Sequence, residues 1–147
     1  MEIATSARTL LEHKGRDVWT ISPEVTVFEA IQQMASKNIG ALPVVENGKL
    51  VGILSERDYM SKVALKGRSS KETAVRDIMV REVVTVTPEQ TVSECMSLVT
   101  ERRVRHLPVV QDGAVIGVVS IGDLVRWTIA TQRVTIEQLE KYIAGGY

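Results

Sequence analysis

The chain has 147 residues, no net formal charge and a pI of about 6.7, so its overall field favours neither nucleic acid nor an anionic membrane surface. Hydrophobic residues make up 44% and charged residues 24%, which is typical of one globular domain or of two small, closely packed ones. The apolar runs are too short to span a bilayer, and the first residues lack a signal peptide's basic end and apolar stretch. We therefore expect a cytoplasmic protein that does not enter a membrane.

Few side chains in the sequence could hold a metal or carry out catalysis. Cys95 is the only cysteine, which excludes an internal disulfide and a cysteine-based zinc site. His13 and His106 are not spaced as metal ligands. No nucleophile–base pair and no Gly-rich phosphate loop can be found. We expect no metal, no catalytic residue and no catalytic cofactor.

The first elements are a helix, a short strand and a turn. Apolar residues at helical spacing predict a helix that ends at Gly15. A strand is predicted over 18–21 and a turn over 22–24. The residues of the helical stripe are Ile3, Ala7, Leu10 and Leu11.

An amphipathic helix and a hairpin follow. Thr26 and Glu29 have the spacing of a capping box in front of a helix whose apolar stripe runs from Val27 to Met34. Strands are predicted over 42–45 and 50–54, joined by a tight turn at Asn47-Gly48.

The second strand of this hairpin runs into the motif Gly52-Ile53-Leu54-Ser55-Glu56-Arg57-Asp58, with a helix predicted over 59–65. A strand that enters a helix through Ser-x-x-Asp places a hydroxyl and a carboxylate beside free backbone N–H groups. One interpretation is a helix cap. The other is a binding site, because helix starts also attract phosphates.

After a polar linker over 66–73, the same order of elements begins again. The sequence predicts a strand over 83–86, a turn over 87–89, a helix from Val92 to Val99 capped by Thr91 with Glu94, strands over 107–110 and 114–119 around a turn at Asp112-Gly113, and a helix over 124–131.

The two halves are copies of one another. Shifting the first by 65 residues superposes Leu42-Pro43-Val44-Val45 on Leu107-Pro108-Val109-Val110, and Ser55 and Asp58 on Ser120 and Asp123, without a gap. With only two copies, mutual packing of the two units is the simplest way to bury their apolar faces.

The end of the chain carries one more apolar stripe. Ile136, Leu139, Tyr142 and Ile143 predict a helical tail over 135–144, which ends at Gly145-Gly146. This stripe could pack back on the module or on a partner chain.

The order strand–helix–Leu-Pro-Val-Val–hairpin–Gly-x-x-Ser-x-x-Asp–helix, present twice, resembles a tandem pair of cystathionine β-synthase (CBS) domains, known as a Bateman module, over residues 7–132. The resemblance implies an α/β (α+β) fold of two β-α-β-β-α repeats packed sheet to sheet with pseudo-twofold symmetry. The expected units are repeat 1 at 7–66, repeat 2 at 74–132 and a helical tail at 133–147. It further implies a stand-alone regulatory module that usually forms a homodimer and binds an adenosine-containing ligand, such as AMP, ADP, ATP, NAD or S-adenosylmethionine.

The two aspartates have the chemistry to bind the ribose of such a ligand. A carboxylate can accept hydrogen bonds from both vicinal hydroxyls of a ribose, and charge-assisted bonds of this kind contribute about 1.5–3 kcal/mol each. If each motif faces the other repeat, as in the family, two clefts result. The Asp58 cleft is expected to contain Ile53, Ser55, Arg57, Asp58, Val80, Val84, Arg105 and His106. The Asp123 cleft is expected to contain Lys14, Trp19, Thr20, Ile39, Gly40, Ala41, Val118, Ser120 and Asp123.

The copies differ in charge near the motif. The second repeat has Arg102-Arg103-Val104-Arg105-His106 where the first has small, uncharged residues. We therefore expect phosphorylated adenosine to prefer the Asp58 cleft, and the Asp123 cleft to be roomier and more apolar. For Arg102 and Arg103 we favour a solvated helix end. Trp19 could stack on adenine, fill the cleft or belong to the core, and Cys95 is expected to be inert packing.

Four functions can be weighed. The first is an adenosine-nucleotide-sensing module that signals to an effector protein, whose identity the sequence does not reveal. The second is a structural or dimerisation module with vestigial clefts. An enzyme is disfavoured by the missing catalytic residues. Nucleic-acid binding through the arginine cluster is disfavoured by the neutral net charge.

Overall fold

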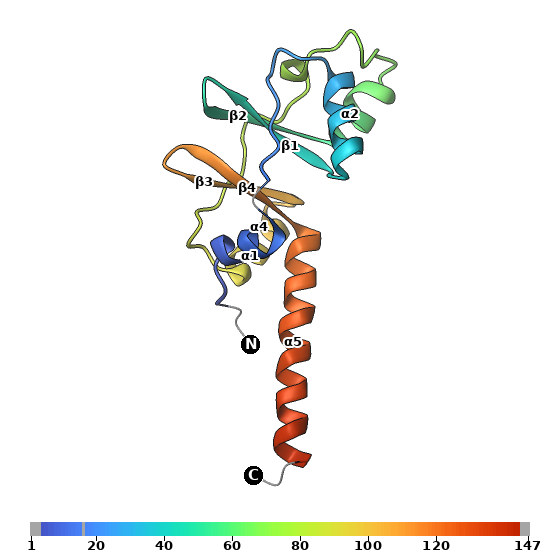
Figure 1. The fold of residues 1–147 in the computed structure, drawn as a ribbon. Helices are drawn as coiled ribbons and strands as arrows, with labels where there is room; N and C mark the ends of the chain where they lie inside the picture. The colour runs from blue at the N-terminus through green and yellow to red at the C-terminus, as the bar shows by residue number, and fades with distance from the viewer. Residues whose placement is uncertain (1–3, 16, 145–147) are drawn as a thin grey trace.

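A computed structural model describes residues 4–15 and 17–144 of the chain. Two β-hairpins, each accompanied by helices, lie one above the other, and a long helix projects from the lower half (Figure 1). The described residues form α1 (Ala7–Lys14), α2 (Val27–Lys37), β1 (Ala41–Glu46), β2 (Lys49–Ser55), α3 (Glu56–Tyr59), the π-helix η1 (Met60–Ala64), the 3-10 helix η2 (Val75–Asp77), α4 (Val92–Glu101), β3 (His106–Gln111), β4 (Ala114–Ser120) and α5 (Ile121–Ala144).

The two hairpins are the predicted ones and have the same register. β1 pairs antiparallel with β2, and β3 with β4, each with an irregularity at the same repeat position. Asn47 and Gly48 have φ angles of 54° and 77°, and Asp112 and Gly113 repeat this pair of left-handed residues. Two such residues form the turn whose twist matches that of the flanking strands. The two sheets contact each other through β2 and β4, so the α+β fold of two repeats packed through their sheets is confirmed.

The first strand predicted in each repeat was wrong in length. Only Ile21 and Val86 form a bridge in these segments, parallel to Val44 and Val109. Extending the ladder back toward Trp19 would require an N–H from Pro43, which has none, and Pro108 imposes the same limit in the second repeat. The residue pair Leu-Pro therefore reduces each expected strand to one paired residue.

The helices begin where their caps predict. Thr91 and Glu94 form a complete capping box at α4. At α2, the Thr26 hydroxyl accepts a hydrogen bond from the Glu29 N–H at 3.2 Å, which is one half of the predicted box. The first predicted helix begins at Ala7, and Ile3, expected in its stripe, lies outside the described residues.

The core has two parts, one in each half of the molecule. The first is built around Leu42, Leu54 and α2, and the second around Leu107, Val119 and α4. The segments before the hairpins cross over between them. Ala7, Leu10 and Leu11 of α1 belong to the second core, whereas Val75, Ile78 and Met79 belong to the first. This exchange brings α1 to the second motif and the η2 region to the first.

The C-terminal part is one helix, not the two that were predicted. α5 runs without interruption from Ile121 to Ala144 and extends well beyond the body of the molecule (Figure 1). No glycine or proline occurs after Gly122 within it, so the backbone has no reason to stop near residue 132. Gly145 and Gly146, the expected end of the tail, lie outside the described residues.

Candidate ligand-binding clefts

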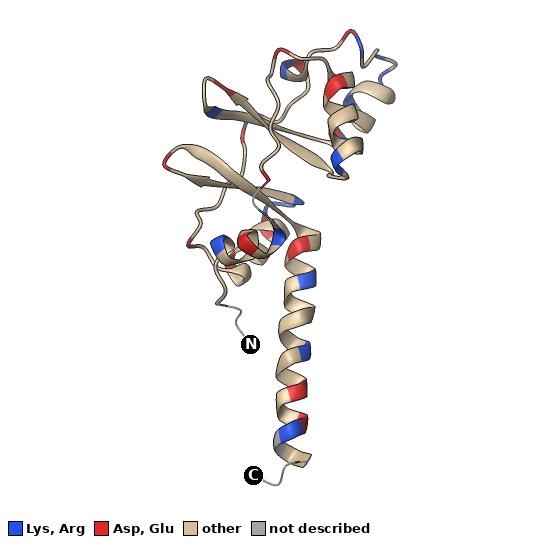
Figure 2. Cartoon of the chain, in the orientation of Figure 1, with Lys and Arg blue, Asp and Glu red and all other residues tan. Residues whose placement is uncertain are grey.

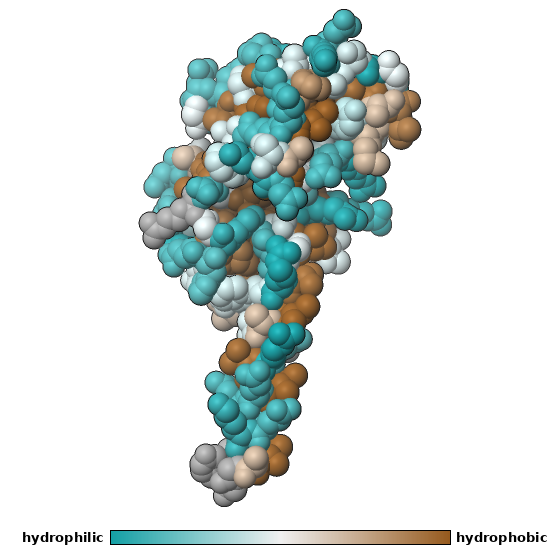
Figure 3. Space-filling view, turned by 45° about the vertical axis from the view of Figure 1, so that its right-hand side comes forward, coloured by the Kyte–Doolittle hydropathy of each residue, from teal (hydrophilic) through white to brown (hydrophobic). Residues whose placement is uncertain are grey.

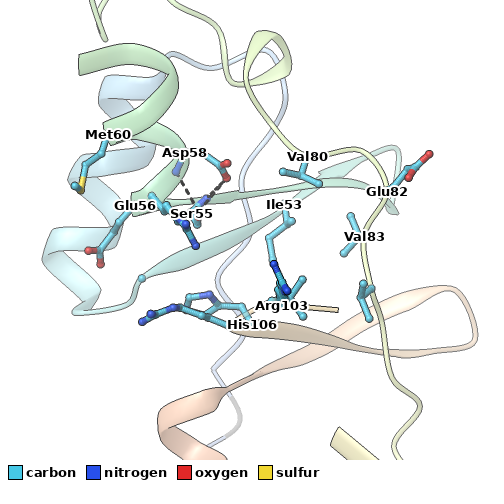
Figure 4. A pocket seen from close by; sticks show the side chains of 15 residues that line it. Ile53, Ser55, Glu56, Asp58, Met60, Val80, Glu82, Val83, Arg103 and His106 are labelled. Carbon is cyan, nitrogen blue, oxygen red and sulfur yellow. Dashed lines mark hydrogen bonds between the residues drawn. The ribbon is translucent and has the colours of Figure 1, made fainter. Parts of the chain in front are cut away.

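The first motif forms a helix cap. The Ser55 Oγ accepts a hydrogen bond from the Asp58 N–H at 3.2 Å, and the Asp58 Oδ2 accepts one from the Ser55 N–H at 2.9 Å (Figure 4). Asp58 is buried, and the Lys62 Nζ lies 3.2 Å from its Oδ1. The cap therefore engages Oδ2, whereas Oδ1 pairs with a long lysine side chain that a ligand hydroxyl could replace.

The second motif has the same cap, but its aspartate pairs with two cations instead of one. The Asp123 Oδ2 accepts from the Ser120 N–H at 2.8 Å and from the Lys14 Nζ at 2.7 Å, and Oδ1 accepts from the Arg126 Nη2 at 2.8 Å. Burial raises the pKa of the Asp123 carboxyl, but the hydrogen bonds from Lys14 and Ser120 outweigh burial, so its pKa lies below the ordinary value. Asp123 is therefore an anion whose oxygens are already occupied.

A cleft of about 540 Å³ lies beside Asp58, within the range of small-molecule sites (Figure 4). All eight side chains expected there line it, because the segment that follows η2 and the turn after α4 reach over from the other repeat. Their role in binding stays a prediction. Sequence reasoning missed seven further lining residues, several of them neighbours of expected ones: Gly40, Glu56, Met60, Glu82, Val83, Arg103 and Val104.

Arg103 corrects one expectation. It has a left-handed φ of 54°, which turns the chain sharply after α4 and brings this residue to the wall of the Asp58 cleft. Arg102 is the C-cap of α4 and does not line that cleft. The cleft thus carries three arginines, at 57, 103 and 105, together with the carboxylates of Glu56, Asp58 and Glu82. Only a three-dimensional turn distinguishes Arg103 from Arg102, which explains why the sequence did not.

The cleft beside Asp123 is smaller, at about 340 Å³, and more highly charged than expected. The prediction that it would be roomier and more apolar was wrong, because the Lys14 and Arg126 side chains reach Asp123 from α1 and α5. Eight of the nine expected residues line it: Lys14, Trp19, Ile39, Gly40, Ala41, Val118, Ser120 and Asp123. Those missed were Leu11, Gly15, Asp17, Val18, Asn38, His106, Gly117 and Arg126.

Thr20 is the expected residue that the structure does not place at this cleft. It is exposed, and its carbonyl accepts a hydrogen bond from the Gln33 Nε2 at 3.4 Å. Trp19 packs against the first core, and the Lys37 Nζ lies 4.1 Å from its ring centroid.

His106 lines both clefts. Burial lowers its pKa below the ordinary value, and the positive charge of Lys14 lowers it further, while Glu56 and Asp123 act in the opposite direction. The neutral imidazole is therefore favoured in the folded protein at neutral pH.

Within the described residues, no group of three or more histidine, cysteine or acidic side chains is arranged to hold a metal ion. No helix in that part of the chain is both long and apolar enough to cross a membrane. Cys95 is buried in the second core, as expected for a packing residue.

A family model for the CBS domain matches residues 14–65 and 75–129. The mitochondrial CBS domain-containing protein CBSX3 of Arabidopsis thaliana is 42% identical, and the alignment covers 98% of this chain and 74% of that protein. The crystal structure of a putative signal-transduction protein with CBS domains from Burkholderia ambifaria has a TM-score of 0.82 and 47% identity, and covers 87% of this chain and 96% of that one.

Two further similarities concern ligands and enzymes. The CBS domain pair of protein MJ0100, solved in complex with 5-methylthioadenosine and S-adenosyl-L-methionine, has a TM-score of 0.77 and 26% identity, covering 88% of this chain and 99% of that one. The inosine-5'-monophosphate dehydrogenase of Thermoplasma acidophilum is 38% identical over 75% of this chain, but over only 21% of the dehydrogenase.

Proposed function

The chain belongs to the CBS domain family, and we propose that it is a regulatory module that binds a phosphorylated adenosine ligand in the Asp58 cleft and signals to a partner protein. AMP, ADP, ATP and NAD are the candidate ligands. A location in the cytoplasm stays a prediction from the sequence.

The observation that carries this proposal is the distribution of charge in the Asp58 cleft. Three arginines line it beside a buried aspartate whose Oδ1 pairs with Lys62 alone among the described residues at 3.2 Å. Asp58 would accept hydrogen bonds from the ribose hydroxyls, and the arginines would bind the phosphate groups in charge-assisted, bidentate geometry. Ile53, Val80 and Val84 would provide apolar contacts for the base.

A related protein supports the ligand class. The domain pair of MJ0100 binds two adenosine-containing molecules, and its fold covers nearly the whole of this chain. Neither of those ligands carries a phosphate, whereas the Asp58 cleft offers three arginines as phosphate partners beside its three carboxylates. Regulation then requires that a partner bind the ligated and unligated states with different affinities.

Two other functions are less well supported. We propose that the chain is not itself an enzyme, since the dehydrogenases that resemble it do so only over a small part of their length. The alternative of a dimerisation module with vestigial clefts would leave the cluster of arginines around a 540 Å³ cleft without a role.

Thermal denaturation with a panel of AMP, ADP, ATP, NAD, adenosine and S-adenosylmethionine tests the proposal. A ligand at about 100 times its Kd adds about 2.7 kcal/mol of stability, which raises the melting temperature of a chain of this size by several degrees. We expect the phosphorylated ligands to raise it most. If no ligand of the panel raises it in protein stripped of copurified nucleotide, the binding proposal is wrong and the vestigial alternative stands.

We also propose that the protein is a homodimer, with α5 contributing to the contact. Apolar side chains follow the projecting helix (Figure 3), and the helix also carries charged residues of both signs (Figure 2). Five of the apolar residues fall at the alternating spacings of three and four that pair one helix with another, with Gln132 at the one polar position of the series: Val125, Ile129, Ile136, Leu139 and Ile143. A stripe with this spacing matches a second copy of itself.

Light scattering after size exclusion tests the dimer. Leu139→Asp places a charge in the stripe and should shift the mass from two chains to one. Val134 is 53% exposed but lies off the stripe, so Val134→Asp is the matched control and should leave the mass unchanged. A dimer that survives Leu139→Asp would exclude α5 from the contact.

A further inference from the structure

In the two clefts, equivalent backbone carbonyls accept hydrogen bonds from different donors. Ile53 and Val118 are related by the 65-residue repeat. In the first cleft, the Ile53 carbonyl accepts a hydrogen bond from the Val80 N–H at 2.9 Å. In the second, the Val118 carbonyl accepts from the Lys14 ammonium at 2.7 Å, and the same ammonium donates to the Asp123 Oδ2, also at 2.7 Å.

Lys14 can do this because of its place in the fold. It is the last residue of α1, and α1 crosses over to pack on the second repeat. Its side chain is 37% exposed, whereas that of Asp123 is 7% exposed, so a long flexible cation extends over a buried anion. Ala7 and Val75 donate to the repeat-equivalent carbonyls of Gln90 and Val25, so the structural counterpart of Lys14 at the first cleft is Glu82. An ionised carboxylate accepts hydrogen bonds and cannot donate to an aspartate as Lys14 does.

A ribose that binds Asp123 has to displace this ammonium. The charged groups that line the cleft are Lys14, Asp17, Asp123 and Arg126, and His106 is favoured in its neutral form. The displaced Lys14 loses a strong acceptor at the edge of a partly buried cleft, which is unfavourable unless another anion replaces it. A phosphate group on the ligand would supply that anion, whereas the neutral ligand adenosine would not.

We propose that Lys14 makes the Asp123 cleft selective for phosphorylated over unphosphorylated adenosine ligands. The inference rests on the proposed function and concerns the second cleft alone. In the Asp58 cleft, phosphate is recognised by arginines, so the selectivity there does not depend on Lys14.

Isothermal titration of the Asp58→Ala variant with AMP and with adenosine isolates the Asp123 cleft. We expect AMP to bind it at least about tenfold more tightly than adenosine, because one charge-assisted hydrogen bond supplies at least that ratio. Adding Lys14→Met, which removes the cation but keeps a long unbranched side chain, should reduce the ratio of the two Kd values by about tenfold. Adding Lys49→Met, an exposed lysine on β2 that lines neither cleft, should leave the ratio unchanged.

The melting temperature of each variant checks folding, and Lys14→Arg, which keeps the cation, should retain the selectivity. The inference is overturned if Lys14→Met leaves the ratio unchanged, or if Asp58→Ala binds AMP and adenosine equally or binds neither. A failure of this kind is distinct from failure of the proposed function, in which the wild-type protein itself would bind no adenosine ligand.

Discussion

His106 lies against Gly40, and together the two residues form a wall that both clefts share. A Cβ atom on Gly40 would lie 3.2 Å from the His106 Nε2, and both residues line both clefts. The charges of Lys14 on one side and Glu56 on the other both reach the imidazole. His106 therefore lies between the two clefts, within reach of charged groups from both.

The lowered pKa of His106 predicts a pH dependence of stability. The unfolded chain binds the proton at the ordinary value of 6.5, whereas the folded protein binds it only at lower pH, so the stabilisation is present above 6.5 and is lost as the pH falls through the pKa of the folded state. Urea denaturation between about pH 7.5 and 5.5 should show the free energy of unfolding decreasing, and His106→Gln should flatten this decrease.

His13→Gln is the matched control for this experiment, because His13 is exposed on α1. It should retain the wild-type slope. The lowered pKa of Asp123 has the same sign but acts around and below its ordinary value of 3.8, outside this range of pH. An unchanged slope in His106→Gln would mean that the histidine is not responsible.

Arg103 and Arg102 form a matched pair for testing phosphate recognition. Arg103 lines the Asp58 cleft and Arg102 does not. Loss of one charge-assisted hydrogen bond costs about 1.5–3 kcal/mol, so Arg103→Ala should weaken AMP binding by about tenfold or more while Arg102→Ala has little effect. Both variants are titrated with AMP. Equal losses of affinity would mean that Arg103 is part of a solvated helix end and does not bind the phosphate.

The approach of Met79 and Val80, which follow η2, to the first hairpin predicts the effect of a methyl group on Gly52. A Cβ there would lie 2.7 Å from the Met79 Sδ and 3.0 Å from the Val80 carbonyl oxygen, and the backbone atom cannot move without breaking the bridge to Ile53. Gly52→Ala should lower the free energy of unfolding by about 1–3 kcal/mol. Gly122→Ala in α5 should instead leave it unchanged or raise it by about 0.5–1 kcal/mol. The prediction is wrong if both substitutions lower the free energy of unfolding or both raise it.

Cys95 should be unreactive in the folded protein. Burial, with a smaller contribution from the charge of Glu94, raises the pKa of its thiol to about 11, so the reactive thiolate is scarce at pH 8. Ellman's reagent at pH 8 should label the native chain far more slowly than the urea-unfolded chain. Comparable rates would show that Cys95 is accessible.

The sequence predicts the elements that depend on local patterns. The Asn47-Gly48 turn, the Thr91–Glu94 box and the hairpin register follow from residues close together in the chain. The short first strands could also have been predicted, because the proline of Leu-Pro-Val-Val has no N–H to donate to a parallel partner strand. The continuous α5 follows from the absence of a breaker after Gly122.

The clefts were harder to predict because they are assembled from distant segments. The 65-residue repeat and the family pattern identified eight of the fifteen residues that line the Asp58 cleft. The sizes of the two clefts depend on side chains that cross between repeats, such as Lys14 and Arg126 on Asp123, and no local pattern records such contacts. The placement of Arg103 depends on a left-handed turn that few arginines adopt.

The most direct test of the central claim is titration of Asp58→Ala and Asp123→Ala with AMP, alongside the wild-type protein. The Asp58 carboxylate is expected to hold the ribose of the preferred ligand, whereas Asp123 is already paired with two cations. We predict that Asp58→Ala removes the high-affinity binding, with a loss of at least about tenfold, and that Asp123→Ala leaves it largely intact. Equal losses in the two variants, or a larger loss in Asp123→Ala, would contradict the assignment of the nucleotide to the Asp58 cleft.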